Sequence, residues 1–473
     1  MKKSKITIII AVIIGIILIF GGVNHLLDAY VQQQRTTQSG NQAAVGQQPV
    51  SPAQSLILAT MESPEESGVC GEHLEWYYKD EVLVITGTGE MDEYIYSAGR
   101  APWHDSLRNQ IGCVVLDEGV TSIGAAAFDG CGSMTEIVLP SSLTNIEESS
   151  FLGCSSLRQI ALPDNVTSIG KNAFNGCSGL REITLPDGLT SIGETAFYGC
   201  SGLREIMLPD SLTRIDKWTF YGCSGLREIT LPESLTRIDE RAFLDCSSLR
   251  EITIPDGVTS IGEMAFFGCS SLEELTIPDS VTSIDSRAFN GCSGLTEITL
   301  SDSLTNIDQG VFSGCSGLTE IRIPDSVIRI DSWAFENCSG LTGITLSDSL
   351  TNIDQGAFYD CIQLTEITIP DNVTSIGNSA FKDCICLKEI TMPDSVVKIG
   401  NNAFCNCFQL TEIRIPDGVT SIGNNAFYNC DGLTEIRIPD GVTSIGDGAF
   451  CDWSGRPEIA IPQRVTSIGD SGF

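Results

Sequence analysis

Phenylalanine recurs at a fixed interval of 23 residues along most of this chain, without one insertion or deletion. Sixteen of the 19 phenylalanines lie on this grid, from Phe128 to Phe473. A fixed period in this range is typical of a solenoid, because each repeat buries its apolar face only by stacking on its neighbours. The grid therefore predicts one repeat solenoid over residues 112–473, with about 16 coils.

Each repeat carries signals for three local structures, as the unit at residues 249–271 illustrates. Ile252 and Ile254 alternate with polar residues, which predicts a short strand. Pro255-Asp256-Gly257 is a turn sequence, and a second extended arm follows it. The last part of the unit has the apolar spacing of a helical turn, at Ala265, Phe266, Cys269 and Leu272. We expect each coil to hold a short strand, an extended arm and a short helical turn.

Most of the cysteines follow the same grid. Of 19 cysteines, 14 lie three residues after a grid phenylalanine, from Cys131 to Cys430. A cysteine at a core position behaves as a small buried hydrophobe. Adjacent coils would place these thiols roughly 5 Å apart, so a disulfide is not forbidden by distance. The pattern favours a reduced ladder and leaves oxidation open, chiefly for the off-grid Cys70, Cys113, Cys386, Cys405 and Cys451.

Three segments precede the repeats. Residues 1–27 contain lysines followed by an apolar run, Ile6 to Val23, which spans about 27 Å as a helix, near the thickness of a bilayer core. This run predicts a membrane anchor with the repeats outside the cell, or a signal sequence whose cleavage would release a secreted protein. Residues 28–67 are polar and predict a flexible tether. Residues 68–111 predict a small β-rich N-terminal cap.

The repeat consensus, Leu-x-x-Ile-x-Ile-Pro-Asp-x-Val-Thr-Ser-Ile-Gly-x-x-Ala-Phe-x-x-Cys, closely resembles the 23-residue leucine-rich repeat of the BspA-like bacterial surface proteins. The resemblance covers about three quarters of the chain. It implies a leucine-rich-repeat fold and a secreted or surface-anchored protein. Adhesion to host matrix proteins or to other cells is attributed to some members of this family. No residue motif carries that activity, so the resemblance assigns no residue a role.

Charge and histidine content argue against two functional classes. The chain has 61 acidic and 27 basic residues, a net charge of −34, whereas nucleic-acid binding requires a basic surface. Its three histidines, His25, His73 and His104, all precede the repeats. Acid–base pairs for catalysis need unlike environments, and a repeat makes environments alike. We therefore predict no catalytic residue, no enzyme activity and no cofactor, with calcium as the one alternative.

Outward positions form columns one residue wide, and two columns are candidate binding surfaces. One is a column of glutamates before the first strand position, including Glu297, Glu320 and Glu366. It would bind a divalent cation or a basic ligand, or would simply be solvated and prevent sideways aggregation. In part of the array Arg158, Arg181, Arg204, Arg227 and Arg250 precede these positions and would offset the negative charge.

The other column is aromatic. Tyr198, Tyr221 and Phe267 follow grid phenylalanines, and Trp218 lies nearby. Tyrosine and tryptophan are over-represented in interface hot spots, although the rings would equally lie flat on neighbouring coils.

Together these features predict a non-enzymatic cell-surface leucine-rich-repeat protein that mediates adhesion. Its partners would be proteins or glycans of a host or neighbouring cell. The alternatives are a structural surface spacer without a ligand and a cation-binding acidic scaffold.

Overall fold

The computed structural model describes residues 52–95, 99–453 and 459–469. The chain divides into two compact units, residues 1–52 and 53–473, and nearly all described residues belong to the second. The expected anchor of residues 1–27 and most of the expected tether lie outside the described residues. None of the helices in the described part of the chain is long and apolar enough to cross a bilayer.

A small sheet precedes the repeats and continues into them. Helix α3 (Pro52–Glu62) is followed by β1 (Glu66–Gly71), β2 (Leu74–Lys79) and β3 (Val82–Gly87). These strands are antiparallel, and β3 pairs in parallel with β5 (Cys113–Leu116), which pairs with the first repeat strand. Because the parallel strand pairing of the repeats continues from β5 to β3, the first coil has no unpaired strand edge on this side.

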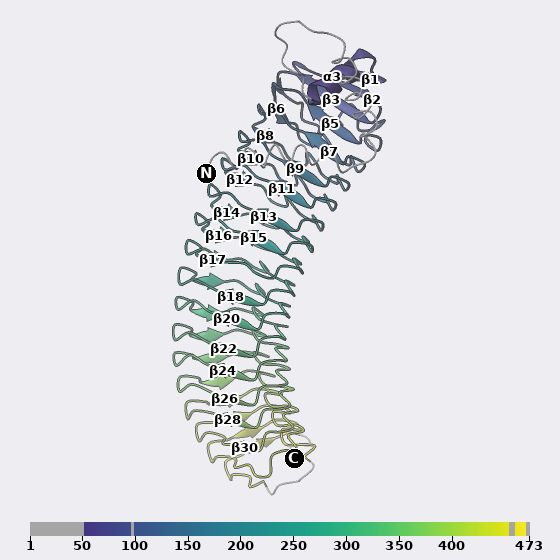
Figure 1. The fold of residues 1–473 in the computed structure, drawn as a ribbon. Helices are drawn as coiled ribbons and strands as arrows, with labels where there is room; N and C mark the ends of the chain where they lie inside the picture. Colours follow the sequence, from purple (N-terminus) through teal and green to yellow (C-terminus); the bar gives the residue numbers. More distant parts are fainter. Residues whose placement is uncertain (1–51, 96–98, 454–458, 470–473) are drawn as a thin grey trace, which may run out of the picture. The chain divides into compact units, whose positions relative to one another are not determined.

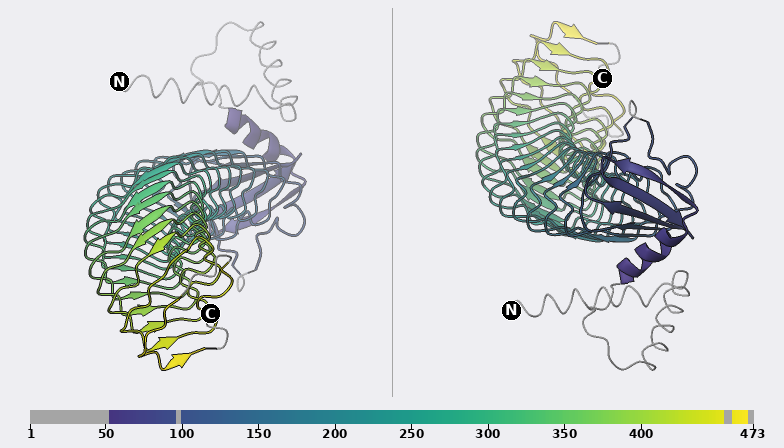
Figure 2. Two further views of the ribbon diagram at one scale, coloured as in Figure 1. Left: turned by 90° about the horizontal axis from the view of Figure 1, so that it is seen from below. Right: turned by 90° about the horizontal axis from the view of Figure 1, so that it is seen from above.

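The tether prediction is wrong for residues 52–67, which form α3 and the start of β1. The apolar run Leu56-Ile57-Leu58 supplies the reason. Ile57 is 7% exposed and packs with Val82, Val84 and Val115 on the sheet, so α3 lies beside the cap strands (Figure 2). The helix forms here because the sheet face covers Ile57 and part of Leu56, whereas Leu58 remains exposed.

The repeats form two rows of short parallel strands, in which residues 23 apart pair with each other, as Ile206 does with Ile229 (Figure 1). The first row, on the arm after each leucine, consists of β7 (Glu136–Val138), β9 (Gln159–Ala161), β11 (Glu182–Thr184), β13 (Glu205–Met207), β15 (Glu228–Thr230), β18 (Glu274–Thr276), β20 (Glu297–Thr299), β22 (Glu320–Arg322), β24 (Gly343–Thr345), β26 (Glu366–Thr368), β28 (Glu389–Thr391) and β30 (Glu412–Ile413). The second row, after the proline turn, starts at β4 (Gly89–Glu90) and β6 (Val120–Ile123) and continues with β8 (Asn145–Ile146), β10 (Ser168–Ile169), β12 (Ser191–Ile192), β14 (Arg214–Ile215), β16 (Arg237–Ile238), β17 (Ser260–Ile261), β19 (Ser283–Ile284), β21 (Asn306–Ile307), β23 (Arg329–Ile330), β25 (Asn352–Ile353), β27 (Ser375–Ile376), β29 (Lys398–Ile399), β31 (Ser421–Ile422), β32 (Ser444–Ile445) and β33 (Ser467–Ile468).

The segment around each grid phenylalanine is a chain of turns, so the predicted helical turn is not formed in the described coils. In the coil at Phe266, the Cys269 N–H donates to the Phe266 carbonyl (3.1 Å), whereas the Phe266 N–H donates to Ala288 of the next coil (2.8 Å). Met264 has a left-handed φ of 54°. An α-helix needs consecutive bonds to the residue four back, and here alternate N–H groups bond the neighbouring coil instead.

The core confirms the stacking that the period predicts. Each grid phenylalanine from Phe128 to Phe427 is completely buried. Successive rings lie 5.1–5.9 Å apart and within 20° of parallel. Such offset stacks stabilise beyond the area that they bury. The fold class, a leucine-rich-repeat solenoid, is as the sequence predicts.

Tryptophan packs on the phenylalanine column in the cap and in the coil of Phe450. Trp103 stacks on Phe128 at 5.7 Å, and its indole N–H donates to the Ala127 carbonyl at 2.8 Å. Trp453 stands at the position of the grid cysteines, contacts Phe450 edge-on at 5.9 Å and donates to the Phe427 carbonyl at 2.6 Å. Each tryptophan thus adds a large apolar surface to the core while its polar atom remains satisfied.

The grid cysteines have buried side chains and are present as thiols. The thiols of the grid cysteines from Cys154 to Cys430 donate hydrogen bonds of 3.1–3.3 Å to the phenylalanine carbonyl of the preceding coil. Cys223, for example, donates to Phe197. The same carbonyl accepts a backbone N–H, so both of its acceptor positions are used. Burial raises the pKa of Cys223, Cys292 and Cys338 to about 12, which keeps the thiols protonated and unreactive at neutral pH.

Candidate binding surfaces

An open groove of about 1030 Å³ runs along the first strand row in the second half of the array. Its walls come from β20, β22, β24, β26 and β28, and the predicted residues Glu297, Glu320 and Glu366 all line it. The structure therefore brings these three carboxylates to one surface. Rows of threonine accompany them, including Thr299, Thr345 and Thr368.

The groove has a notch where the glutamate column is interrupted. Gly343 occupies the position that is glutamate in β20, β22 and β26, and a Cβ added there would meet nothing within 4 Å. Beneath it, Ile344 is half-buried, whereas the equivalent Ile321 and Ile367 are 5% and 4% exposed. The missing side chain thus uncovers apolar surface between acidic neighbours.

Negative charge dominates this groove. Carboxylates on adjacent coils stand about 4.8 Å apart and repel by about 0.9 kcal/mol in water. Arg322 is the basic residue in the lining, and it lies 3.8 Å from Asp302 and 3.5 Å from Asp325. Across the described residues, no group of three or more His, Cys, Asp or Glu side chains is placed to hold a metal ion. The arrangement favours a ligand with several separate basic groups.

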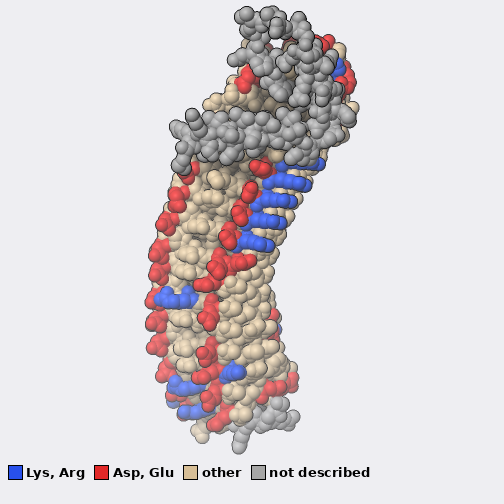
Figure 3. Space-filling view, viewed as in Figure 1, with Lys and Arg blue, Asp and Glu red and all other residues tan. Residues whose placement is uncertain are grey.

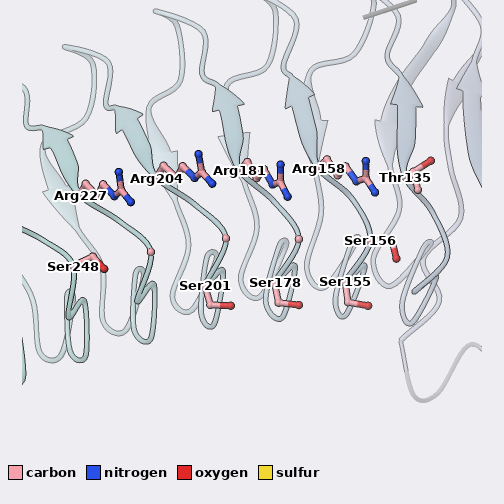
Figure 4. A pocket seen from close by; sticks show the side chains of 13 residues that line it. Thr135, Ser155, Ser156, Arg158, Ser178, Arg181, Ser201, Arg204, Arg227 and Ser248 are labelled. Carbon is pink, nitrogen blue, oxygen red and sulfur yellow. The ribbon is translucent and has the colours of Figure 1, made fainter. Parts of the chain in front are cut away.

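A second groove, of about 570 Å³, follows the arginine column in the first half of the array. Arg158, Arg181, Arg204 and Arg227 line it and extend side by side from successive coils, with a row of serines beside them (Figure 4). The space-filling view shows arginines in a row next to a line of acidic side chains (Figure 3). We call Arg158, Arg181, Arg204, Arg227 and Arg250 the arginine ladder; all five are exposed.

Glycine allows a close approach of three coils at the floor of this second groove. A Cβ on Gly179, Gly202 or Gly225 would lie 2.3–2.5 Å from a serine carbonyl of the preceding coil. The equivalent position is serine in the flanking coils, at Ser156 and Ser248, so backbone and serine hydroxyls form the floor between the arginines.

Four residues of the arginine ladder do not neutralise the neighbouring glutamates by direct contact. Among the described residues, Arg181, Arg204, Arg227 and Arg250 have no carboxylate within 4.0 Å. Six other arginines of the described coils each have such a partner, namely Arg214, Arg237, Arg241, Arg322, Arg329 and Arg414. For these four ladder residues the expected charge compensation is thus at most long-range, and their guanidinium groups remain available.

The predicted aromatic residues are only partly gathered. Tyr198 and Tyr221 stack on each other at 4.6 Å, and Trp218 accepts a cation–π contact from Arg241 at 5.9 Å. Phe267 lies two coils beyond Tyr221, with the buried Leu244 between them. Tyr198 is 38% exposed, while Tyr221, Trp218 and Phe267 are half-buried. These rings therefore lie against neighbouring coils and against each other, which is the arrangement the sequence left as the alternative to a binding surface.

The buried histidine of the cap, His104, is held by structural partners. His104 is 5% exposed, and its two ring nitrogens lie 3.0 Å from Asp105 and 3.1 Å from Arg108. Hydrogen bonds from His104 and then Arg100 lower the pKa of Asp105. Ser106 donates to Glu66, so these neighbours do not form a nucleophile–base pair.

Sequence reasoning missed the notch at Gly343 and the glycine floor. The sequence does contain signals for both. Gly343 is an exception in a column of glutamates, and Gly179, Gly202 and Gly225 recur at one grid position. What it could not show is which outward columns face a common groove, because that depends on how the coil closes.

Comparison with known proteins gives the family. The profile of the BspA type leucine-rich repeat region matches residues 108–226, 144–273, 259–388 and 374–473. Comparison with curated proteins gave no match. A leucine-rich repeat protein of Bacteroides ovatus is 28% identical, with a TM-score of 0.62, over 83% of this chain and 94% of that one.

A leucine-rich cell surface protein of Faecalibacterium prausnitzii is 24% identical, with a TM-score of 0.37, over 70% of this chain and 95% of that one. The repeat profile covers well over half of the present sequence. The chain belongs to the BspA-type leucine-rich repeat family.

Proposed function

We propose that this protein is a non-enzymatic cell-surface adhesin that binds a basic segment of a partner protein in the groove lined by Glu297, Glu320 and Glu366. The observation that carries the proposal is the notch at Gly343, because it combines exposed apolar surface with flanking carboxylates. A partner side chain that enters the notch would bury Ile344, and basic groups on either side would meet glutamate. Interfaces commonly combine such an apolar anchor with charged surroundings that fix orientation.

The location of the binding event is part of the same proposal. The apolar run of residues 6–23 follows three lysines, which suits an uncleaved anchor with the repeats outside the cell. Adhesion then requires an extracellular partner, either a host matrix protein or a protein of a neighbouring cell. Protease added to intact cells should release the repeats, and complete protection of the repeats would contradict this orientation.

The binding proposal is tested by filling the notch. Gly343→Glu completes the acidic column without a steric clash, since nothing lies within 4 Å of the added Cβ. The purified full chain is screened against surface and matrix proteins at fixed salt, and each protein that binds is then measured with the variant. We expect Gly343→Glu to weaken binding at least tenfold, about 1.4 kcal/mol, by closing the anchor position.

A matched pair of charge variants separates the groove from the rest of the column. Glu297→Gln/Glu320→Gln/Glu366→Gln removes three carboxylates inside the groove, and Glu182→Gln/Glu205→Gln/Glu228→Gln removes three from equivalent positions outside it. Only the first set should weaken binding. Equal losses from both sets would replace the groove with non-specific attraction. If no protein is bound, the chain is a surface spacer and the proposal is wrong.

A further inference from the structure

We propose that the arginine ladder is a second, independent binding site, which takes a linear anionic polysaccharide along the axis of the array. The site is the groove lined by Arg158, Arg181, Arg204 and Arg227, and its ligand class is a glycan that bears carboxylate or sulfate groups. This site lies on different coils from the groove at Gly343 and has the opposite charge. Neither proposal therefore depends on the other.

Ladder geometry suits a linear polymer. The backbones of the ladder residues pair from coil to coil, with the Arg181 N–H donating to Arg158 and the Arg227 N–H to Arg204, each at 2.8 Å. Their spacing is consequently the inter-strand spacing, about 4.8 Å, and five residues extend over about 19 Å. The labelled side chains run parallel in Figure 4. A small anion would use one or two of these arginines, whereas a chain with repeated anionic groups uses all of them.

Three arginines that line the groove have no ion-pair partner in the described part of the chain, whereas six other arginines of the repeats do. With a net charge of −34, carboxylates are abundant, yet Arg181, Arg204 and Arg227 have none within 4.0 Å among the described residues. No Asp or Glu is among the described residues that line the groove. Interactions beyond about 8 Å are largely screened at physiological salt. A ligand in the groove therefore contacts the arginines directly, while the glutamates that follow them, such as Glu182 and Glu205, lie outside the lining.

The groove lining favours a glycan over a nucleic acid. Apart from arginine, it consists of Thr135, serines and glycines, whose hydroxyl and backbone groups match the hydroxyl groups of sugars. Proteins that bind single-stranded nucleic acid stack bases on aromatic side chains, and none of the described lining residues is aromatic. Guanidinium groups bind carboxylate and sulfate oxygens through two parallel hydrogen bonds.

The test measures binding of the full chain to heparin, to hyaluronan, to neutral dextran and to a single-stranded poly(dT) oligonucleotide. We expect binding to heparin or hyaluronan and none to dextran. Arg181→Gln/Arg204→Gln/Arg227→Gln should lower the affinity at least tenfold and reduce its dependence on salt, because fewer counterions are released. The conservative Arg181→Lys/Arg204→Lys/Arg227→Lys variant should retain the salt dependence and lose part of the affinity, since lysine lacks the planar fork.

The control is Arg214→Gln/Arg237→Gln, which removes arginines that already have carboxylate partners. It should leave glycan binding within about twofold of the parent, and thermal melting verifies that each variant is folded. Unchanged heparin and hyaluronan binding in the triple glutamine variant would overturn the proposal. So would tighter binding of poly(dT) than of either anionic glycan, or absence of binding to both. Because none of these substitutions touches the Gly343 groove, binding of a basic protein segment remains an independent readout.

Discussion

The first and second halves of the repeat array have the same interior and different surfaces. Phe197 and Phe220 stack at 5.4 Å in the first half, and Phe335 and Phe358 stack at 5.4 Å in the second. The outward column before the strand is arginine from residue 158 to residue 250, and it is threonine from residue 296 to residue 434, apart from Lys388. Four of these threonines donate to a backbone carbonyl of the preceding coil, as the Thr342 hydroxyl does to Thr319 at 3.0 Å.

This difference shows what the period constrains. Inward side chains pack against the same residue of two neighbouring coils, so every coil must repeat the same solution. An outward side chain need not repeat from coil to coil. It can either donate a hydrogen bond to a backbone carbonyl of the preceding coil or extend into solvent toward a ligand. The two grooves of opposite charge are consequences of that freedom, on one uniform framework.

The largest expected effect tests whether the interiors are equivalent. Phe220→Ala and Phe358→Ala each remove a completely buried ring from the stack, and each should lower the free energy of unfolding by about 3–5 kcal/mol. Denaturant unfolding of both variants measures the losses. Values that differ by more than about 1 kcal/mol would show that the halves are not packed alike, and a loss below that in either would contradict the inward stacking.

An intermediate effect is expected from moving the arginine ladder. Thr319→Arg/Thr342→Arg/Thr365→Arg places arginine at the equivalent positions of the second half, in a column that already includes Lys388. The substitutions at Thr342 and Thr365 each remove a hydroxyl bond worth roughly 1 kcal/mol. In the background of the triple-glutamine ladder variant, the three new arginines should restore at least part of the heparin binding. A graft that folds and restores no binding would mean that the serine and glycine floor is essential as well.

The smallest effect concerns the aspartates after the second strand row. Burial, then Asp331 and Asp285, raise the pKa of Asp308; burial likewise raises the pKa of Asp331. A raised folded-state pKa means that the folded protein binds the proton more tightly, so these groups stabilise fully below the ordinary value of 3.8 and lose that stability as pH rises through the folded pKa.

Asp308→Asn should accordingly raise the free energy of unfolding at pH 7 by about a few tenths of a kcal/mol, as for like-charged neighbours on a sheet. The melting temperature should rise with it. Its advantage over the parent should shrink as the pH is lowered toward 4. Melting curves of both proteins across this range provide the measurement. An advantage that grows on acidification would give the opposite sign and exclude this origin.

The sequence predicts the solenoid because the side chains that decide it are periodic. Phe128 and its equivalents mark every coil, and the paired strands follow from the alternation at positions such as Ile252 and Ile254. The predicted helical turn was not confirmed. The apolar spacing around Phe266 does not reveal that the Phe266 N–H donates to the next coil. Helix α3 was missed because Ile57 is buried by a sheet that is remote in the sequence.

The candidate sites were less predictable than the fold. The column of Glu297, Glu320 and Glu366 is visible in the sequence, but the notch depends on what lies beneath Gly343. The arginine ladder is also visible, yet its position beside Glu182 and its equivalents suggested charge compensation. Only side-chain geometry shows that the guanidinium groups of Arg181 and Arg204 have no such partner.

The central claim is that one uniform framework carries two independent surfaces of opposite charge. One titration tests it: the full chain saturated with heparin or hyaluronan, whichever it binds, is titrated with the protein identified in the binding screen. The account predicts that both ligands bind together, with each affinity within about threefold of its value alone. It also predicts that Gly343→Glu removes only the protein and that Arg181→Gln/Arg204→Gln/Arg227→Gln removes only the glycan. Mutually exclusive binding, or loss of both ligands in either variant, would contradict it.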